Sequence, residues 1–141
     1  MVTINNTQAL TEQERQFKKI VSCITKQYPT AKSIRLLETL HGYKTMFKIG
    51  GIKYISSFSE GGNWIQTQRK IKLSDVPHSI RKTVKIRYPK AQVLSVKEIV
   101  SYTRHSPLYL LDIIYEQNIS SVCKLYFTSQ GILEREEFEP S

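Results

Sequence analysis

The chain has 141 residues, 40% of them hydrophobic and 23% charged, and its 21 Lys and Arg against 12 Asp and Glu give a net charge of +9. This composition is typical of a soluble globular protein with a real core. No apolar run is long enough to span a bilayer. The first residues lack the basic start and apolar stretch of a secretory signal, but an exported protein whose signal has been removed would lack them too. The positive charge favours anionic partners without naming one.

The first predicted helix begins with a capping box, in which Thr11 is followed three residues later by Glu14. Ile20, Ile24 and Tyr28 recur at the spacing of one helix face. Because a residue before proline is pushed out of the helical region, we expect this helix to end before Pro29.

The period changes after Pro29 from helical to alternating, which predicts strands. The alternating positions of the first strand are Ile34, Leu36, Glu38 and Leu40. The next stretch, YKTMFKIGGIKYISSF at 43–58, predicts a hairpin because Gly50 and Gly51 can supply the positive φ angles of a type I′ turn. A last strand is predicted to open at Trp64, after the glycine turn in FSEGGNW.

The same signals occur again 60 positions later, where YPTAKSIRLLE at 28–38 is matched by YPKAQVLSVKE at 88–98. The flanks match too, since Ile80, Val84 and Tyr88 repeat the spacing of the first helix face. The second helix is predicted to begin near Ser74 and Asp75, either of which can cap, with Pro77 in the first turn and the end before Pro89.

The predicted strands of the second half follow in the same order. The alternating positions of the first of them are Leu94, Val96, Glu98 and Val100. A hairpin turns near Gln117 and Asn118, and FTSQGIL at 127–133 matches FSEGGNW at a spacing of 69. The change from 60 to 69 places extra residues around YTRHSP at 102–107.

We therefore predict an α+β fold, a tandem repeat of a helix plus a four-stranded antiparallel sheet, with the helices on one face. The expected organisation is an N-terminal extension at 1–10, a first repeat at 11–72 and a second repeat at 73–141. Because a unit of roughly 60 residues is marginal alone, the two should pack together with their sheets joined or adjacent.

Three short motifs carry a resemblance over about residues 11–138: GNW at 62–64, DVP at 75–77 and YPKA at 88–91. In these the chain resembles the PepSY-like proteins, whose tandem modules share the fold of the beta-lactamase inhibitory protein. The resemblance implies an exported, often periplasmic, non-catalytic module, and both protein inhibition and a calcium response have been proposed for the family. The second half departs from the pattern, with Leu133 in place of tryptophan and the turn NIS in place of glycines.

The residues themselves indicate no enzyme, metal or cofactor. His41, His78 and His105 fall in a strand end, a helix start and a loop, so they are not expected to converge. The acidic residues lack the dense spacing of a calcium loop. Cys23 and Cys123 lack metal-ligand spacing, and a disulfide between them is disfavoured because their places in the two halves are not equivalent.

Several residues have two interpretations. Glu38 and Glu98, in phase with apolar neighbours, could be equivalent ligands or salt-bridge acceptors, but we favour glutamates that reach water at the end of the helix cover. Tyr28, Tyr88 and Trp64 are expected to pack in the core. The basic residues of the two helices are interpreted as solvated faces.

The uncovered face of the sheet is the predicted site. If Tyr43, Phe47, Tyr54 and Phe58 face the helix, strand alternation puts their neighbours on the other side, and the second half adds Asp112. The predicted protein-binding residues are Lys44, Met46, Lys48, Lys53, Ile55, Lys124 and Tyr126. An ordinary solvated sheet face also carries lysines, so the alternative interpretation is a surface with no role in binding.

We accordingly predict a non-enzymatic, exported protein- or peptide-binding module that acts through its open sheet face on an acidic partner, with inhibition as one form this binding could take. The alternative is a basic nucleic-acid-binding domain. Such a domain needs exposed aromatics flanked by cations, whereas most aromatics here fall on the covered face, so a nucleic-acid partner is disfavoured.

Overall fold

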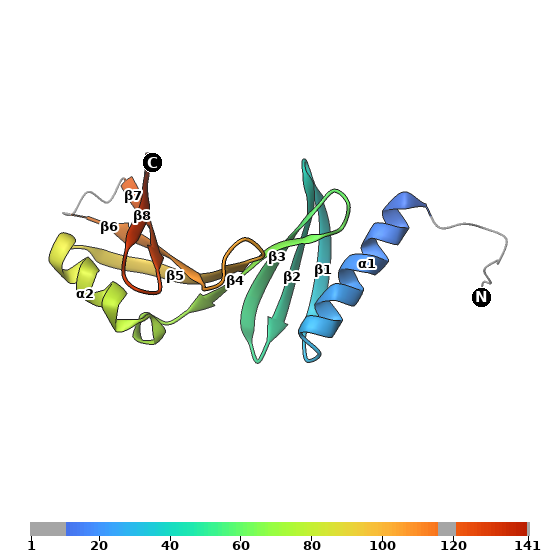
Figure 1. The fold of residues 1–141 in the computed structure, drawn as a ribbon, viewed down its shortest axis with the longest axis horizontal. Helices are drawn as coiled ribbons and strands as arrows, with labels where there is room; N and C mark the ends of the chain where they lie inside the picture. Colours follow the sequence, from blue (N-terminus) through green and yellow to red (C-terminus); the bar gives the residue numbers. More distant parts are fainter. Residues whose placement is uncertain (1–10, 116–120, 141) are drawn as a thin grey trace.

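The computed structural model of the chain describes residues 11–115 and 121–140, in the order helix, four strands, helix, four strands (Figure 1). The helices are α1 (Glu12–Gln27) and α2 (His78–Arg87), and the 3-10 turn η1 (Leu73–Asp75) precedes α2. The strands are β1 (Lys32–Thr39), β2 (Gly42–Ile49), β3 (Ile52–Ser59), β4 (Trp64–Ile71), β5 (Gln92–Ser101), β6 (Leu108–Ile114), β7 (Ser121–Thr128) and β8 (Leu133–Pro140). We call α1 with β1–β4 the first half and α2 with β5–β8 the second half.

All eight strands belong to one antiparallel sheet in the order β1 to β8. The halves join where β4 pairs with β5, from Gln66 opposite Ser101 to Ile71 opposite Val96. The α+β class is therefore confirmed, and the expected two four-stranded sheets are one continuous sheet. Figure 1 shows this sheet strongly twisted, with α1 near one end and α2 near the other.

The predicted start of α1 is confirmed, because the Glu14 amide donates to Thr11 Oγ1 at 3.1 Å and the Thr11 amide donates to Glu14 Oε1 at 2.9 Å. Both helices end at the predicted places, with Tyr28 and Tyr88 as C-caps. The predicted start of the second helix is wrong. Ser74 and Asp75 form η1 instead, and Pro77 precedes α2 without a capping side chain.

The predicted Gly-Gly hairpin is confirmed, since β2 and β3 are joined by Gly50 with φ 56° and Gly51 with φ 81°. Leu40 lies one residue beyond β1 and is 86% exposed, so the alternation predicted for this strand does not reach Leu40. The turn expected near Gln117 and Asn118 lies outside the described residues.

Each helix packs on its own half of the sheet. The first core joins α1 to β2 and β3, and its buried members are Ile20, Ile24, Tyr43, Phe47 and Phe58. The second core joins α2 to β5, β6 and β7, and its members include Ile80, Val84, Val96, Leu111, Leu125 and Phe127. One row of directly paired residues links the two cores: Phe47, Tyr54, Arg69, Glu98, Tyr109 and Phe127. Paired residues share a side of the sheet, so both helices cover the same face, which we call the covered face, and leave the other, the open face, uncovered.

An ion pair occupies the covered face between the two cores. Arg69 Nε donates to Glu98 Oε1 at 2.7 Å, and the Tyr109 hydroxyl donates to Glu98 Oε2 at 3.3 Å. The Glu98 side chain is only 19% exposed, so the expectation that it simply reaches water is wrong. The same expectation holds for Glu38, which is exposed and accepts from Gln13 Nε2 at 2.9 Å.

The three predicted core aromatics are all packed and half-buried. Tyr28 lies with its ring centroid 5.3 Å from that of Phe47, and burial raises the pKa of its hydroxyl. Tyr88 donates to Glu136, and burial followed by this hydrogen bond raises its pKa. Trp64 Nε1 donates to Thr67 Oγ1 at 2.8 Å.

Both cysteines are free thiols in different cores, with Cys23 half-buried and Cys123 buried. Burial, with a smaller contribution from Glu136, raises the pKa of the Cys123 thiol and disfavours its reactive thiolate. We expect iodoacetamide to modify Cys23 in the native protein at pH 8 and to modify Cys123 only after unfolding in urea. Peptide mass spectrometry checks this, and equal labelling rates in native buffer would contradict it.

Candidate functional site

Lysines occupy one cross-strand row of the open face. Lys32 pairs with Lys48, Lys48 with Lys53, and Lys70 with Lys97. The pair of Tyr54 with Arg69 places Lys53 beside Lys70, which closes the series. The lysine row therefore consists of Lys32, Lys48, Lys53, Lys70 and Lys97, one from each of five neighbouring strands, with strands spaced about 4.8 Å apart.

The charges of the lysine row are not neutralised inside the described part of the chain. Its members other than Lys97 are exposed, and none forms an ion pair with another described residue. Like charges directly opposite each other in a sheet are destabilising. The row is thus a concentration of positive charge held at some cost to the free protein.

The predicted residues of the first half all lie on this open face. Met46 is paired with Ile55, two residues along the strands from the pair of Lys48 with Lys53 and on the same face. Both apolar side chains are half-buried. Lys44, in the same strand as Met46, is exposed. The register thus brings these residues together, while their part in binding stays a prediction.

The second half of the open face is hollowed into a cavity of about 600 Å³, which we call the open-face cavity. Its floor is apolar, because Ile99 and Leu110 are only 8% and 7% exposed although no helix covers this side. Gln66 and Gln68 of β4 line the side toward the lysine row. The cavity and the row therefore form one continuous surface on the open face.

The outer wall of the open-face cavity is the loop between β5 and β6. Arg104 of this loop forms a two-pronged ion pair with Glu134 of β8, which holds the loop beside the sheet. Tyr102 lines the cavity and is 69% exposed. These residues were not predicted for the site from the sequence, although the change of spacing from 60 to 69 located the extra residues that build the wall.

Lys124 and Tyr126, predicted for binding, lie on the open face in different surroundings. Lys124 Nζ lies 3.3 Å from Asp112 Oδ1, so its charge is balanced within the chain. Tyr126 lines the open-face cavity with the Arg135 guanidinium 4.1 Å above its ring centroid. Tyr126 thus lines the cavity, whereas the charge of Lys124 is balanced by Asp112, and the part of either residue in binding stays a prediction.

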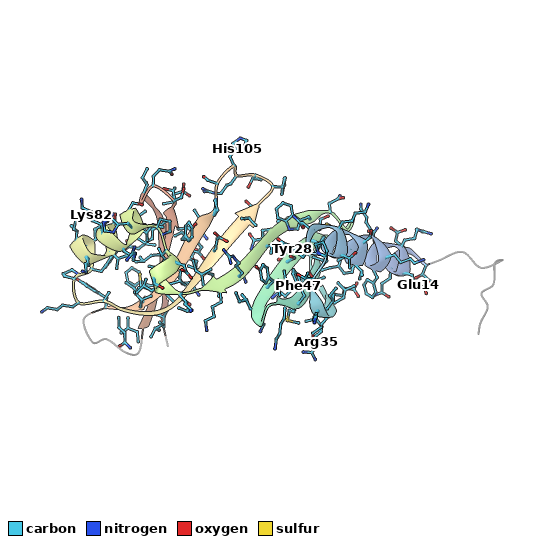
Figure 2. The ribbon with its side chains drawn as sticks, turned by 90° about the horizontal axis from the view of Figure 1, so that it is seen from below. Glu14, Tyr28, Arg35, Phe47, Lys82 and His105 are labelled. Atoms are coloured by element: carbon cyan, nitrogen blue, oxygen red, sulfur yellow. The ribbon has the colours of Figure 1, made fainter. Side chains whose placement is uncertain are left out.

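The structure does not bring the histidines together. His41 lies in the turn after β1, His78 begins α2, and all three histidines are exposed. Figure 2 shows His105 at the tip of the β5–β6 loop, far from the side chains around Phe47. Within residues 11–115 and 121–140, no group of three or more His, Cys, Asp or Glu could hold a metal ion, and neither helix there is long and apolar enough to cross a membrane.

The fold and this face define an α+β protein with a helix-covered sheet and a basic open face, and solved structures share that fold. A BLIP-like protein from Bacteroides fragilis NCTC 9343 has a TM-score of 0.78 at 18% identity, over 96% of this chain and 92% of that one. A DUF2874 family protein from Bacteroides uniformis ATCC 8492 has a TM-score of 0.77 at 17% identity, over 85% of this chain and 87% of that one. A candidate periplasmic protein from Bacteroides eggerthii DSM 20697 has a TM-score of 0.76 at 19% identity, over 85% of this chain and 86% of that one.

These likenesses confirm the BLIP-like fold that the sequence predicts. No family model matches the sequence. No curated protein matches it either. The more specific relation to PepSY proteins therefore stays a prediction.

Proposed function

We propose that the chain is a non-enzymatic module, formed by two PepSY-like repeats, that binds an acidic protein or peptide through its open face. The lysine row carries the proposal, because it places five positive charges side by side without ion pairs among the described residues. Functional sites commonly retain features that cost stability. An acidic partner would relieve the repulsion on binding.

The open face offers two kinds of contact to a partner, one from charged and one from apolar side chains. Lysines at the rim of an interface chiefly raise the association rate, and salt screens them. Buried aromatic and aliphatic anchors control dissociation. Met46 and Ile55 beside the row, and Tyr102 and Tyr126 in the open-face cavity, are the anchors that we propose.

The comparisons support export as the setting of this binding, and the BLIP-like fold is compatible with inhibition as one form of it. One similar structure is described as a candidate periplasmic protein and another as BLIP-like. We propose an exported location on that ground, together with the resemblance in the sequence. The separated histidines support the absence of an enzymatic role.

A nucleic acid is the competing partner, since phosphates would also suit the lysine row. The aromatics that could stack bases argue against it. Tyr43, Phe47 and Phe58 are buried under α1, and Tyr102 and Tyr126 lie in the second half, away from most of the lysines. Binding of a single-stranded nucleic acid needs aromatic and basic residues interleaved on one surface.

The lysine row makes an unusual prediction about stability. Lys48→Glu with Lys70→Glu turns the row into alternating charges, so each repulsive neighbour pair becomes attractive. We expect this variant to raise the free energy of unfolding by about 1 to 2 kcal/mol, allowing for solvent screening, while it loses the partner. Urea denaturation measures the first effect, and affinity capture from envelope and cytosolic fractions measures the second.

The matched control is Lys18→Glu with Lys90→Glu, which makes the same change of net charge at exposed positions outside the sheet. It should capture the same partner as the wild type. If the row variant keeps the captured partner with unchanged association at low salt, the open-face proposal fails. Recovery of nucleic acid instead of protein would favour the competing function.

A further inference from the structure

A second hollow lies on the opposite side of the sheet, between α2, η1 and the start of β5. It has a volume of about 560 Å³, within the range of small-molecule sites. Its floor is apolar and includes Val84, Val93 and Leu111. Leu73 and Ile86 at its edge are 43% and 70% exposed, so apolar surface continues to the rim. We call this hollow the α2 groove.

Three cations of α2 line the same groove: Arg81, Lys82 and Lys85. The sequence of α2, HSIRKTVKIR, contains no acidic residue. Arg81 Nε donates to the Val76 carbonyl at 3.2 Å, whereas Lys82 and Lys85 form no ion pair with any residue that the structure describes. Figure 2 shows Lys82 on α2, at the end of the molecule opposite Glu14 of α1.

The first half provides an internal comparison for these cations. Ile20 and Ile24 of α1 are buried like Ile80 and Val84 of α2, which aligns the two helices 60 positions apart. At the positions equivalent to Arg81, Lys82 and Lys85, α1 has Val21, Ser22 and Thr25. At these three positions α1 packs on its sheet without cations, although Lys18 and Lys26 stand at the positions equivalent to His78 and Ile86. Packing therefore does not require cations at positions 81, 82 and 85 of α2.

We propose that the α2 groove binds a single-chain anionic amphiphile, such as a fatty acid. The acyl chain would lie along the apolar floor, where its burial supplies the affinity. The carboxylate would be held by Lys82 and Lys85, with Arg81 beside them as a charge-assisted donor. Because the groove belongs to the covered face, this site is independent of the open face and of the function proposed for it.

Titration calorimetry with octanoate, decanoate and laurate, each below its micellar concentration, tests the site in the full chain. Burial of methylenes predicts that Kd falls about fourfold with each added CH₂. Dodecyltrimethylammonium has a hydrocarbon tail one methylene longer than that of laurate but a cationic head. Despite the longer tail it should bind at least about tenfold more weakly than laurate, in line with the loss of a charge-assisted contact.

The decisive variant replaces the three cations by the residues of α1, as Arg81→Val, Lys82→Ser and Lys85→Thr. We expect it to weaken laurate binding about tenfold or more. The control variant, Lys44→Ser, Lys48→Ser and Lys53→Ser, removes three cations from the open face and should bind laurate as the wild type does. Ile86→Glu, at a position 70% exposed, tests the groove without burdening the fold and should also weaken binding.

The results that overturn the inference are distinct from those that test the open face. Laurate binding that is unchanged in the α1-like variant overturns it, as does an equal loss in the open-face control. Binding of the wild type to anionic phospholipid vesicles without binding of monomeric laurate also overturns it.

Discussion

Replacing Phe127 by alanine is expected to lower the free energy of unfolding by about 3 to 5 kcal/mol. Phe127 is fully buried in the second core, and Phe58, 2% exposed, holds the equivalent place in the first. Each phenylalanine pairs with the residue that opens the following strand, Trp64 or Leu133. Because truncation removes the ring and leaves a cavity in a close-packed core, Phe58→Ala should cost about as much.

The same variants test whether the two halves unfold together. The single tryptophan of the chain, Trp64, packs in the first core and reports on that half by fluorescence. Since β4 and β5 join the halves in one sheet, Phe127→Ala should lower the urea midpoint of Trp64 fluorescence as much as that of circular dichroism. Phe138→Ala, at a position 69% exposed, is the control and should change stability by less than about 0.5 kcal/mol. An unshifted Trp64 midpoint in Phe127→Ala would show that the halves unfold separately.

Local signals predicted the elements well, because their causes are local. The capping box of Thr11 and Glu14 and the positive φ angles at Gly50 and Gly51 involve residues within one turn of each other. The start of α2 was misplaced because Ser74 and Asp75 are both competent caps. Tertiary contact decides there: Val76 is only 2% exposed, and Ser79 Oγ donates to the Ser129 carbonyl at 3.0 Å.

The open face could be predicted only in part. Which residues share a side of one strand follows from alternation, and the Gly50–Gly51 turn sets the register of β2 against β3, so Lys44, Lys48 and Lys53 could be placed together from the sequence. Which residues of different strands stand opposite each other depends on register, and the pair of Lys70 with Lys97 joins strands of the two halves. The lysine row therefore appears only in the folded sheet.

The open-face cavity is even harder than the lysine row to predict from local sequence signals. Its floor joins residues of β5 and β6, and its wall depends on the ion pair of Arg104 with Glu134, two residues far apart in sequence. Ile99 and Leu110 are buried on a face that no helix covers, and residues of the β5–β6 loop line the same cavity. The inserted residues at 102–107 were visible in the sequence, but the side of the sheet to which they fold was not.

Gly131→Ala is expected to destabilise the protein by about 2 to 5 kcal/mol, for two separate reasons. Gly131 has φ 86°, where an L residue costs about 1 to 2 kcal/mol. A Cβ there would also lie 2.8 Å from the Ser79 carbonyl oxygen of α2, so the helix would have to shift, at a further cost of about 1 to 3 kcal/mol. Ser79 Oγ and Thr83 Oγ1 of α2 donate to the carbonyls of Ser129 and Gly131, so the β7–β8 turn holds α2 on the sheet and, with it, one wall of the α2 groove.

Gly51 provides the matched control for this prediction, because it has φ 81° but a Cβ added there would meet no atom within 4 Å. Gly51→Ala should therefore cost only the conformational part, about 1 to 2 kcal/mol. The difference between the two variants in urea denaturation measures the contact between the turn and α2. Equal losses would mean that the turn does not position the helix, because only the shared backbone cost would then remain.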